Sequence, residues 1–377
     1  MKQIKYSDRI SNIEISTLRQ LFDKAPKEAI NLGLGEIQFQ TPDIITDFAI
    51  DIIKHKNILY TPNAGLIELQ IAIANYYEIP LNGNVCVTSG AEEAIFASLF
   101  SYINKGDEVL IANPTYLAYK TIIEMLDGIT VEFNLNPNSD FALDYIDFEN
   151  KISSKTKILL LNNPSNPTGR CFSEKEVDFM ISKCEEHNVL IIVDEIYREL
   201  YIRSRPSSLL NYQGKIIVIS GISKSHSMSG WRIGWAMSND PYLIKPIITS
   251  HQYICTCAPF ISQKAAIIAL SEKGMEAQNR IREELTKNRE YVIQQLKPLQ
   301  TEIHILENTS SPYLFIKVNV EVMNLVNTLV KNGLIIIPGL SFGSNGKHWI
   351  RLNYGINKKK LAKGLHIFKK YIKLLNR

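Results

Sequence analysis

Short apolar runs that end abruptly in polar residues are the feature that most restricts the folds open to this chain. Val189–Val193 runs directly into Asp194, and Ile216–Ile219 runs into Ser220 and Gly221. Strands covered on both faces are apolar throughout, as in parallel sheets, whereas half-exposed strands alternate. Runs of the same kind occur at Val85–Thr88, Glu108–Ala112 and Lys157–Leu161.

Helical patterns lie between these runs. In Glu92–Ile103 apolar residues recur at helical spacing. Ser173 is followed three residues later by Glu176, the pattern of a capping box, which predicts a helix from there to about His187. Because strands and helices alternate, we expect an α/β fold: a mostly parallel sheet with helices on both faces.

The chain changes character near residue 274. Met275–Leu296 is a long, charged helical pattern that could connect two domains. We therefore expect a large domain over residues 41–275 and a smaller α+β domain made of residues 1–40 and 276–377. The strands expected in the smaller domain are Tyr313–Val318, Leu334–Ile337 and Ile350–Asn353.

Composition and charge exclude several classes of protein. The 377 residues are 45% hydrophobic and 21% charged, close to the globular average, which excludes disorder as the main state. The net charge is only +4, from 42 basic and 38 acidic residues, so we expect no nucleic-acid partner.

The cysteine count and the length of the apolar stretches indicate which cellular compartment to expect. The five cysteines are scattered and odd in number, which argues against a disulfide framework and favours a reducing compartment. No N-terminal run resembles a signal peptide, and none approaches the roughly 18 apolar residues of a membrane span. We therefore expect a soluble cytoplasmic protein without a membrane partner. The seven histidines show no metal-ligand spacing, so we expect no metal.

The candidate site consists of polar residues that follow the apolar runs, because open α/β sheets bind ligands at the carboxyl ends of their strands. Asp194 is a carboxylate at the edge of a buried layer, which is costly without a cationic partner such as a protonated ring nitrogen. Lys224 follows another buried run, and a desolvated lysine is a good nucleophile toward carbonyls. Taken singly, Asp194 could instead be a helix cap or ion pair, and Lys224 a snorkelling side chain.

Two stretches would suit a phosphate. Ser89, Gly90 and Ala91 lie between a predicted strand and helix, where free N–H groups and the helix dipole favour an anion. An ordinary serine N-cap is the alternative. Arg232 follows Lys224 by eight residues, and its bidentate donors also suit a phosphate.

A family resemblance joins these stretches. GISKSHSMSGWRIG, from Gly221 to Gly234, resembles the lysine signature of the class I and II aminotransferases, which are fold type I enzymes dependent on pyridoxal 5′-phosphate. Other segments resemble this family in the same order over most of the chain: Asn31–Pro42, Tyr60–Ile73, Thr88–Ala94, Asn113–Tyr116, Asn162–Gly169, Val193–Tyr197 and Ile350–Gly355.

The resemblance implies roles around the cofactor ring. Lys224 resembles the lysine that holds the cofactor as a Schiff base and carries the transferred proton. Asp194 resembles the acid that keeps the pyridine nitrogen protonated, so that the ring acts as an electron sink. Tyr197 and Asn166 resemble the hydrogen-bond partners of the ring oxygen, and Tyr116 the aromatic residue that stacks on the ring.

The cofactor phosphate would be bound by residues of two copies of the chain. Ser89, Gly90, Ala91 and Arg232 resemble the phosphate ligands. Tyr60 matches a tyrosine that in this family reaches the phosphate across a dimer interface, which implies a homodimer with shared active sites.

The substrate would be bound by three residues. Arg351 resembles the arginine that holds the α-carboxylate in a bidentate pair, and Gly35 and Asn166 resemble further substrate contacts.

Two departures from the family pattern concern the phosphate site and the N-terminal segment. Gly221 stands where a serine is frequent, so one phosphate hydroxyl is missing unless Ser223 or a water replaces it. Ile37 and Gln38 replace a frequent Pro-Asp pair, which bears on the mobility of the segment over the substrate.

The implied activity is transfer of an amino group from an L-amino acid to a 2-oxo acid, expected to be 2-oxoglutarate, with ping-pong kinetics. The lysine segment and His251–Ala266 are most similar to a bacterial branch with aromatic, aspartate and N-acetyl-diaminopimelate aminotransferases, which favours a broad or aromatic donor. Loops around Ile15–Leu18 and Gly35–Phe39 are expected to set selectivity. The alternatives are another pyridoxal-phosphate reaction (a β-lyase, cyclase or oxidase) and a non-catalytic ligand sensor.

Overall fold

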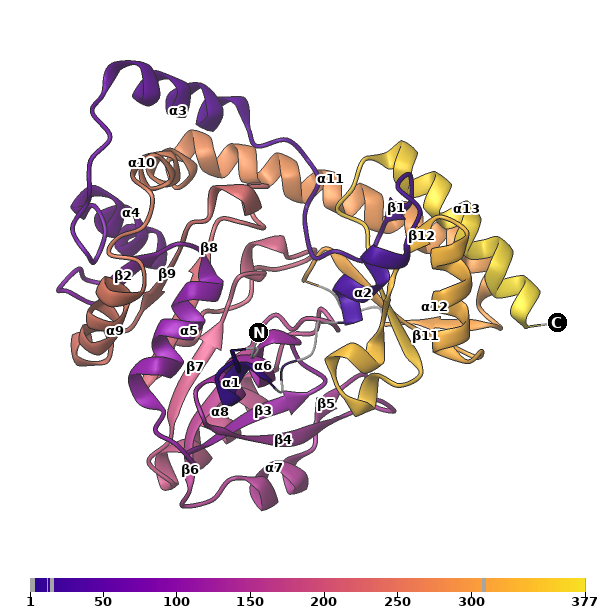
Figure 1. Cartoon of the computed structure of the whole chain (residues 1–377), viewed down its shortest axis with the longest axis horizontal. Coiled ribbons are helices and arrows are strands. Elements are labelled where there is room, and N and C mark those ends of the chain that lie inside the picture. Colours follow the sequence, from indigo (N-terminus) through magenta and orange to yellow (C-terminus); the bar gives the residue numbers. More distant parts are fainter. Residues whose placement is uncertain (1–3, 12, 14–16, 307–309, 377) are drawn as a thin grey trace.

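Three sheets and the helices that cover them form the structure (Figure 1). It is a computed structural model and describes residues 4–11, 13, 17–306 and 310–376. The largest sheet has eight strands in the order β2-β9-β8-β7-β6-β3-β4-β5. These strands are β2 (Val85–Thr88), β3 (Glu108–Asn113), β4 (Ile129–Asn136), β5 (Ala142–Leu143), β6 (Thr156–Asn162), β7 (Leu190–Asp194), β8 (Ile216–Gly221) and β9 (Gly234–Met237).

The centre of this sheet is parallel and its edges are antiparallel. β4, β3, β6, β7 and β8 run in one direction, while β9 pairs antiparallel with both β8 and β2, and β5 with β4. The apolar runs correctly predicted β2, β3, β6, β7 and β8. They missed β4 because only Phe133 and Leu135 of it are buried, and β9 because it is short and begins inside the lysine motif.

Helices cover both faces of the large sheet, which confirms the predicted fold class. In β6, Ile158 and Leu160 pack into one apolar cluster and Leu159 and Leu161 into another on the opposite face. The first face is covered by α5 (Ala91–Tyr102), α6 (Ala118–Met125) and α9 (Pro241–Ile254). The second is covered by α3 (Asp43–His55), α4 (Ile67–Tyr77), α7 (Tyr145–Lys151), α8 (Glu174–Glu186) and α10 (Phe260–Ala269).

The predicted capping box is present at the start of α8. The Ser173 side chain accepts from the Glu176 backbone N–H, and the Glu176 carboxylate accepts from the Ser173 backbone N–H. Each bond satisfies an N–H group that the helix itself cannot pair, which fixes where α8 begins.

A second, antiparallel sheet is built from the C-terminal part of the chain. Its strand order is β10-β11-β14-β13. The predicted strand 334–337 is split between β12, which pairs with β1, and β13, which joins this sheet. The bounds are β1 (Ile30–Asn31), β10 (Ile303–Ile305), β11 (Tyr313–Val318), β12 (Leu334–Ile335), β13 (Ile337–Pro338) and β14 (Trp349–Asn353). The other helices are α1 (Asp8–Ser11), α2 (Thr17–Lys24), α12 (Val322–Lys331) and α13 (Lys358–Leu375).

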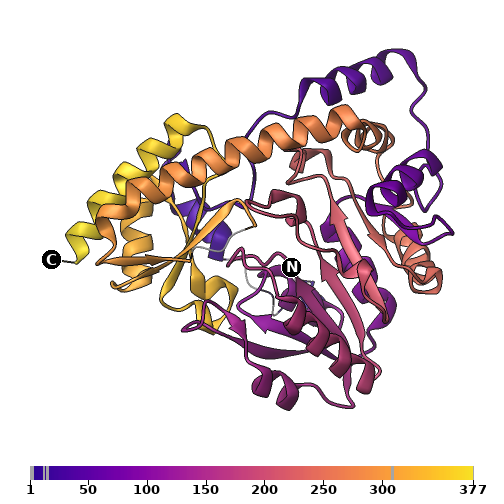
Figure 2. The same cartoon turned by 180° about the vertical axis from the view of Figure 1, so that it is seen from behind.

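The long helix α11 (Glu272–Leu296) runs from the side of the large sheet to the side of the second sheet (Figure 2). Ile281, Leu285 and Val292 are buried along it and belong to the apolar core around the second sheet, on the helix side that the sequence predicted. The division into domains at residues 40/41 and 275/276 stays a prediction. Among the described helices, none has the length and hydropathy of a membrane span.

Candidate active site

A cavity of about 330 Å³ lies where the carboxyl ends of β6, β7 and β8 face residues of β11 and β14. Most of the predicted site residues line it together: Gly35, Ala91, Tyr116, Asn166, Asp194, Tyr197, Lys224, Arg232 and Arg351. Gly90 does not line the cavity, but its backbone lies against the Arg232 guanidinium. Tyr60 does not line the cavity and is 88% exposed on the surface.

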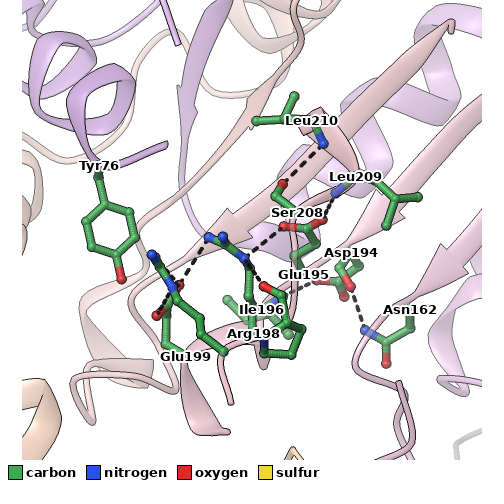
Figure 3. A network of polar contacts seen from close by, with 12 residues as sticks. Tyr76, Asn162, Asp194, Glu195, Ile196, Arg198, Glu199, Ser208, Leu209 and Leu210 are labelled. Atoms are coloured by element: carbon green, nitrogen blue, oxygen red, sulfur yellow. Dashed lines mark hydrogen bonds and ion pairs between the residues drawn. The ribbon is translucent and has the colours of Figure 1, made fainter. Parts of the chain in front are cut away.

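Asp194 is the last residue of β7 and is held in place by three neighbours. Its carboxylate accepts hydrogen bonds from the Ile196 backbone N–H (3.0 Å) and the Tyr119 hydroxyl (3.1 Å). The Asn162 side chain donates to its backbone carbonyl at 2.9 Å (Figure 3). Burial raises the pKa of Asp194 to about 6, and the described residues give it no ion pair. A protonated ring nitrogen is the kind of cation that this buried acid lacks.

Lys224 reaches the same cavity from the end of the neighbouring strand, three residues after β8. Its Nζ donates a 2.6 Å hydrogen bond to the carbonyl oxygen of Gly35. The amine is therefore held by a neutral acceptor rather than by a carboxylate. Asp194 and Lys224 come from adjacent strands, which fits contacts with different atoms of one ring.

Gly90 and Arg232 form a cradle for an anion. Gly90 has a φ of 97°, and a Cβ there would lie 2.6 Å from Nη2 of Arg232. Arg232 donates only to the Ser229 carbonyl (3.0 Å) and has no carboxylate partner among the described residues. The guanidinium without a carboxylate partner, its close approach to the Gly90 backbone and the start of α5 fit a phosphate group. The Ser89 hydroxyl is engaged elsewhere, 3.2 Å from Sγ of Cys255.

Gly221 has a structural reason to be glycine. A Cβ at this position would lie 2.8 Å from the Ile233 carbonyl oxygen and 3.0 Å from Cα of Gly234. The close pairing of β8 with β9 therefore leaves no room for the serine that is frequent in the family. Ser223 lines the cavity, as a replacement hydroxyl would.

Arg351 is a buried cation to which the described residues offer no anion. It is only 2% exposed, and its donors reach the neutral oxygens of Asn166 (2.7 Å) and Gly33 (2.6 Å). Its Nε has no hydrogen-bond partner in the part of the chain that the structure describes. The guanidinium stacks between Tyr313 and Phe342, 4.2 and 4.7 Å from the ring centres. A buried, unpaired charge is costly, so this site suits a ligand carboxylate.

The sequence did not predict several residues that shape the site. The Tyr313 hydroxyl lies 3.0 Å from the Tyr197 hydroxyl, and Tyr119 holds Asp194. Glu92 lines the cavity and accepts a 3.0 Å hydrogen bond from the Tyr116 hydroxyl. Tyr313 is the first residue of a predicted strand, and this position is the only feature of the sequence that could have indicated a role in the site. Tyr119 and Glu92 lie on helices, where no sequence motif distinguishes them from other helical residues.

The segment over the cavity is anchored despite its departure from the family pattern. Ile37 is buried, and the Gln38 N–H donates to the Gly355 carbonyl at 2.7 Å. The Asn353 side chain donates to the carbonyl of Glu36 at 2.7 Å. The other predicted selectivity loop lies largely outside the described residues, because residues 15 and 16 and the Leu18 side chain do.

A buried ionic network lies directly behind Asp194 (Figure 3). Glu195 is 1% exposed, accepts from the Leu209 N–H at 2.7 Å and lies 3.8 Å from Nε of Arg198. Arg198 also contacts Glu199 (3.3 Å), which pairs with Arg205 (2.7 Å). The network ties the end of β7 to the loop that follows it.

Glu195→Gln is expected to weaken the pH dependence of stability. Burial raises the pKa of Glu195 from its ordinary 4.5 to about 7, so the folded protein holds this proton more tightly than the unfolded chain. Wild-type stability therefore falls as pH rises between these values, by up to about 3 kcal/mol. Urea unfolding at about pH 5 and about pH 8 should show a smaller fall for the variant. The exposed Glu185→Gln is the control, and equal falls in all three proteins would refute the expectation.

Comparisons with known proteins identify the family of the chain. Residues 27–368 match the family model described as aminotransferase class I and II. A probable aspartate aminotransferase of Methanocaldococcus jannaschii is 31% identical, over 96% of this chain and 98% of its own. A probable N-acetyl-LL-diaminopimelate aminotransferase of Bacillus subtilis is 32% identical, over 94% of this chain and 92% of its own.

Solved structures show the same similarity. An aromatic aminotransferase from Pyrococcus horikoshii superposes with a TM-score of 0.86 at 26% identity, covering 95% of this chain and 99% of its own. The matches span nearly the whole chain, so the predicted enzyme class and cofactor hold for the chain as a unit. The chain belongs to the class I and II aminotransferase family, and is an aminotransferase that depends on pyridoxal 5′-phosphate.

Proposed function

We propose that this aminotransferase takes the amino group of an L-amino acid with an uncharged, including aromatic, side chain and passes it to 2-oxoglutarate. The main observation behind this substrate class concerns Arg351. Its buried guanidinium contacts two neutral oxygens and, among the described residues, no anion. Each substrate of such a reaction has a carboxylate beside the reacting carbon, and arginine binds this group with two parallel hydrogen bonds.

When bound, pyridoxal phosphate supplies a carbonyl that accepts the amino group and a ring that takes up electrons from the substrate. Arg351 and Asn166 would fix the substrate carboxylate. The Lys224 amine would take the proton from the substrate Cα and hold it for return to the cofactor. Asp194, oriented by Tyr119, would keep the ring nitrogen protonated, and Tyr197 would donate a hydrogen bond to the ring oxygen.

Gly90, Ala91 and Arg232 are the residues that we assign to the phosphate, since the N–H and hydroxyl of Ser89 are engaged by Glu93 and Cys255. The main support is the position of the Arg232 guanidinium, which lies so close to the Gly90 backbone that a Cβ there would clash with it. Tyr116 is assigned to the face of the ring, where its hydroxyl is held by Glu92.

The proposed assembly is a homodimer in which Tyr60 reaches the partner's phosphate site. Ile58, Leu59 and Tyr60 are consecutive and are 48%, 70% and 88% exposed. Contiguous exposed apolar side chains are typical of a contact surface. A cytoplasmic location and the absence of a nucleic-acid partner stay predictions from the sequence.

The charges of the cavity support an uncharged donor side chain. Its three cations, Lys224, Arg232 and Arg351, all have proposed roles, and the remaining charged residues that line it are acids, including Glu36 and Glu92. A second carboxylate therefore finds no free cation among the described residues of this cavity. We propose that the second carboxylate of 2-oxoglutarate, which is one methylene farther from the reacting carbon than that of aspartate, reaches the other copy of the proposed dimer.

A matrix of amino donors and 2-oxo acid acceptors tests the proposal. Phenylalanine or tyrosine with 2-oxoglutarate should give a kcat/KM at least about 10-fold above aspartate with the same acceptor, the scale of one poorly paired charge. Preference for aspartate would refute the proposed donor. Release of ammonia without any acceptor would indicate a lyase reaction.

A further inference from the structure

Three side chains with metal-binding chemistry meet outside the cavity, between α5 and α9. Glu93 lies in the first turn of α5, His251 near the end of α9, and Cys255 directly after it. Each offers one ligand atom, a carboxylate oxygen, a ring nitrogen and a thiol sulfur, and these atoms lie within 4.8 Å of one another.

The most buried member is His251, which has no exposed surface. Its Nδ1 lies 2.5 Å from Oε1 of Glu93, while its Nε2 has no hydrogen-bond partner among the described residues. Nδ1 is the ring nitrogen that faces the carboxylate, so a cation between His251 and Glu93 would contact Nδ1 in place of their hydrogen bond.

We propose that Glu93, His251 and Cys255 form a binding site for a divalent cation of the Zn²⁺ type. Thiolate, imidazole and carboxylate are the three zinc ligands of proteins, and three of them leave a fourth position for water. Binding releases the thiol proton of Cys255, so a thiolate and a carboxylate together neutralise the cation. The partly exposed Cys255 provides the route of entry.

The spacing of the three proposed ligands explains why no metal-binding motif is visible in the sequence. His251 and Cys255 are four residues apart, but Glu93 is 158 residues from His251. Only the packing of α5 against α9 brings the carboxylate to the other two groups. The expectation that the chain has no metal site rested on sequence spacing alone.

The site also contacts the turn before α5. The Ser89 N–H donates to Oε2 of Glu93 at 2.5 Å, and the Ser89 hydroxyl lies 3.2 Å from Sγ of Cys255. Two of the three ligands therefore also hold Ser89, and an ion bound to them would change the setting of this turn.

Metal titration of the tag-free holoenzyme tests the site without measuring activity. Zn²⁺ should bind at one equivalent per chain in calorimetry, and Cd²⁺ should give the ultraviolet charge-transfer band of a thiolate ligand. C255S should remove the band, and both C255S and E93Q should weaken Zn²⁺ binding by more than about 100-fold. C257S, with a thiol two residues away, is the matched control and should bind like the wild type.

Circular dichroism should confirm that each variant is folded. If one is not, protection of Cys255 by Zn²⁺ against alkylation of the wild type, read by mass spectrometry, gives the same answer. Absence of saturable binding, or binding and a cadmium band that C255S leaves unchanged, would overturn the proposal and leave the cluster as a hydrogen-bonded support of the turn.

Discussion

Lys224→Ala is expected to lower kcat by about 10⁴-fold or more, because it removes the amine to which we assign attachment of the cofactor and transfer of the proton. Lys224 is the lysine that lines the cavity, and its Nζ already lies 2.6 Å from the Gly35 carbonyl in the segment above it. Single-turnover absorbance of the cofactor with an amino acid measures the loss. Borohydride reduction followed by mass spectrometry should find the cofactor fixed to residue 224 in the wild type and nowhere in the variant.

Lys215→Ala is the matched control, because Lys215 is an exposed lysine at the opposite end of the same strand. It should retain wild-type turnover and covalent cofactor. Wild-type turnover in Lys224→Ala would contradict the assigned role and favour a different base. A ligand-dependent response without turnover in either protein would favour the ligand-sensor alternative.

Arg351→Ala is expected to lower kcat/KM for amino acids by about 10³-fold, the scale of truncating one partner of a buried charge pair. Arg351→Lys should restore only part of this, because an ammonium cannot form two parallel bonds to a carboxylate. The loss should fall mainly on KM, since the role that we propose for this residue is carboxylate binding and not proton transfer. Steady-state kinetics of the half-reaction with one donor measure both constants.

A primary amine without a carboxylate provides the internal control. Wild type and Arg351→Ala should convert it at similar, low rates, because it cannot use the guanidinium. Arg203→Ala, at an exposed arginine, should leave all constants unchanged. An equal loss for the amine and the amino acid would show that the substitution damaged the site as a whole and not the carboxylate contact.

Much of the fold could be predicted because buried strands leave a strong signal. β6, β7 and β8 are apolar along their length, so that their bounds were predicted to within about two residues. Only two residues of β4 are buried and β9 has four residues beginning with glycine, and neither pattern stands out without its neighbours. Their position depends on pairing with β3 and β8, which is tertiary information.

The sequence motifs identified the candidate site residues, and the structure shows which groups surround them. Asp194 and Lys224 could be found because polar residues at strand ends are conspicuous after apolar runs. That Arg351 lacks an anion, or that Tyr119 holds Asp194, depends on segments that are 185 and 75 residues apart. No local sequence pattern contains such contacts. The meeting of Glu93 and His251 was not predicted for the same reason, because these residues are 158 positions apart.

Arg351 and Lys224 are attached to different parts of the fold. Arg351, the proposed carboxylate anchor, lies in β14 of the second sheet, Lys224 follows β8 of the first, and α11 runs alongside both. A helix of 25 residues is about 37 Å long and resists stretching. The distance between the guanidinium and the amine therefore depends on how the two sheets are held along this helix. Since the carboxylate and the amino group of every α-amino acid share one carbon, we expect this distance to favour α-amino acids over amines whose carboxylate lies farther away, and not to sort α-amino acids by side-chain length.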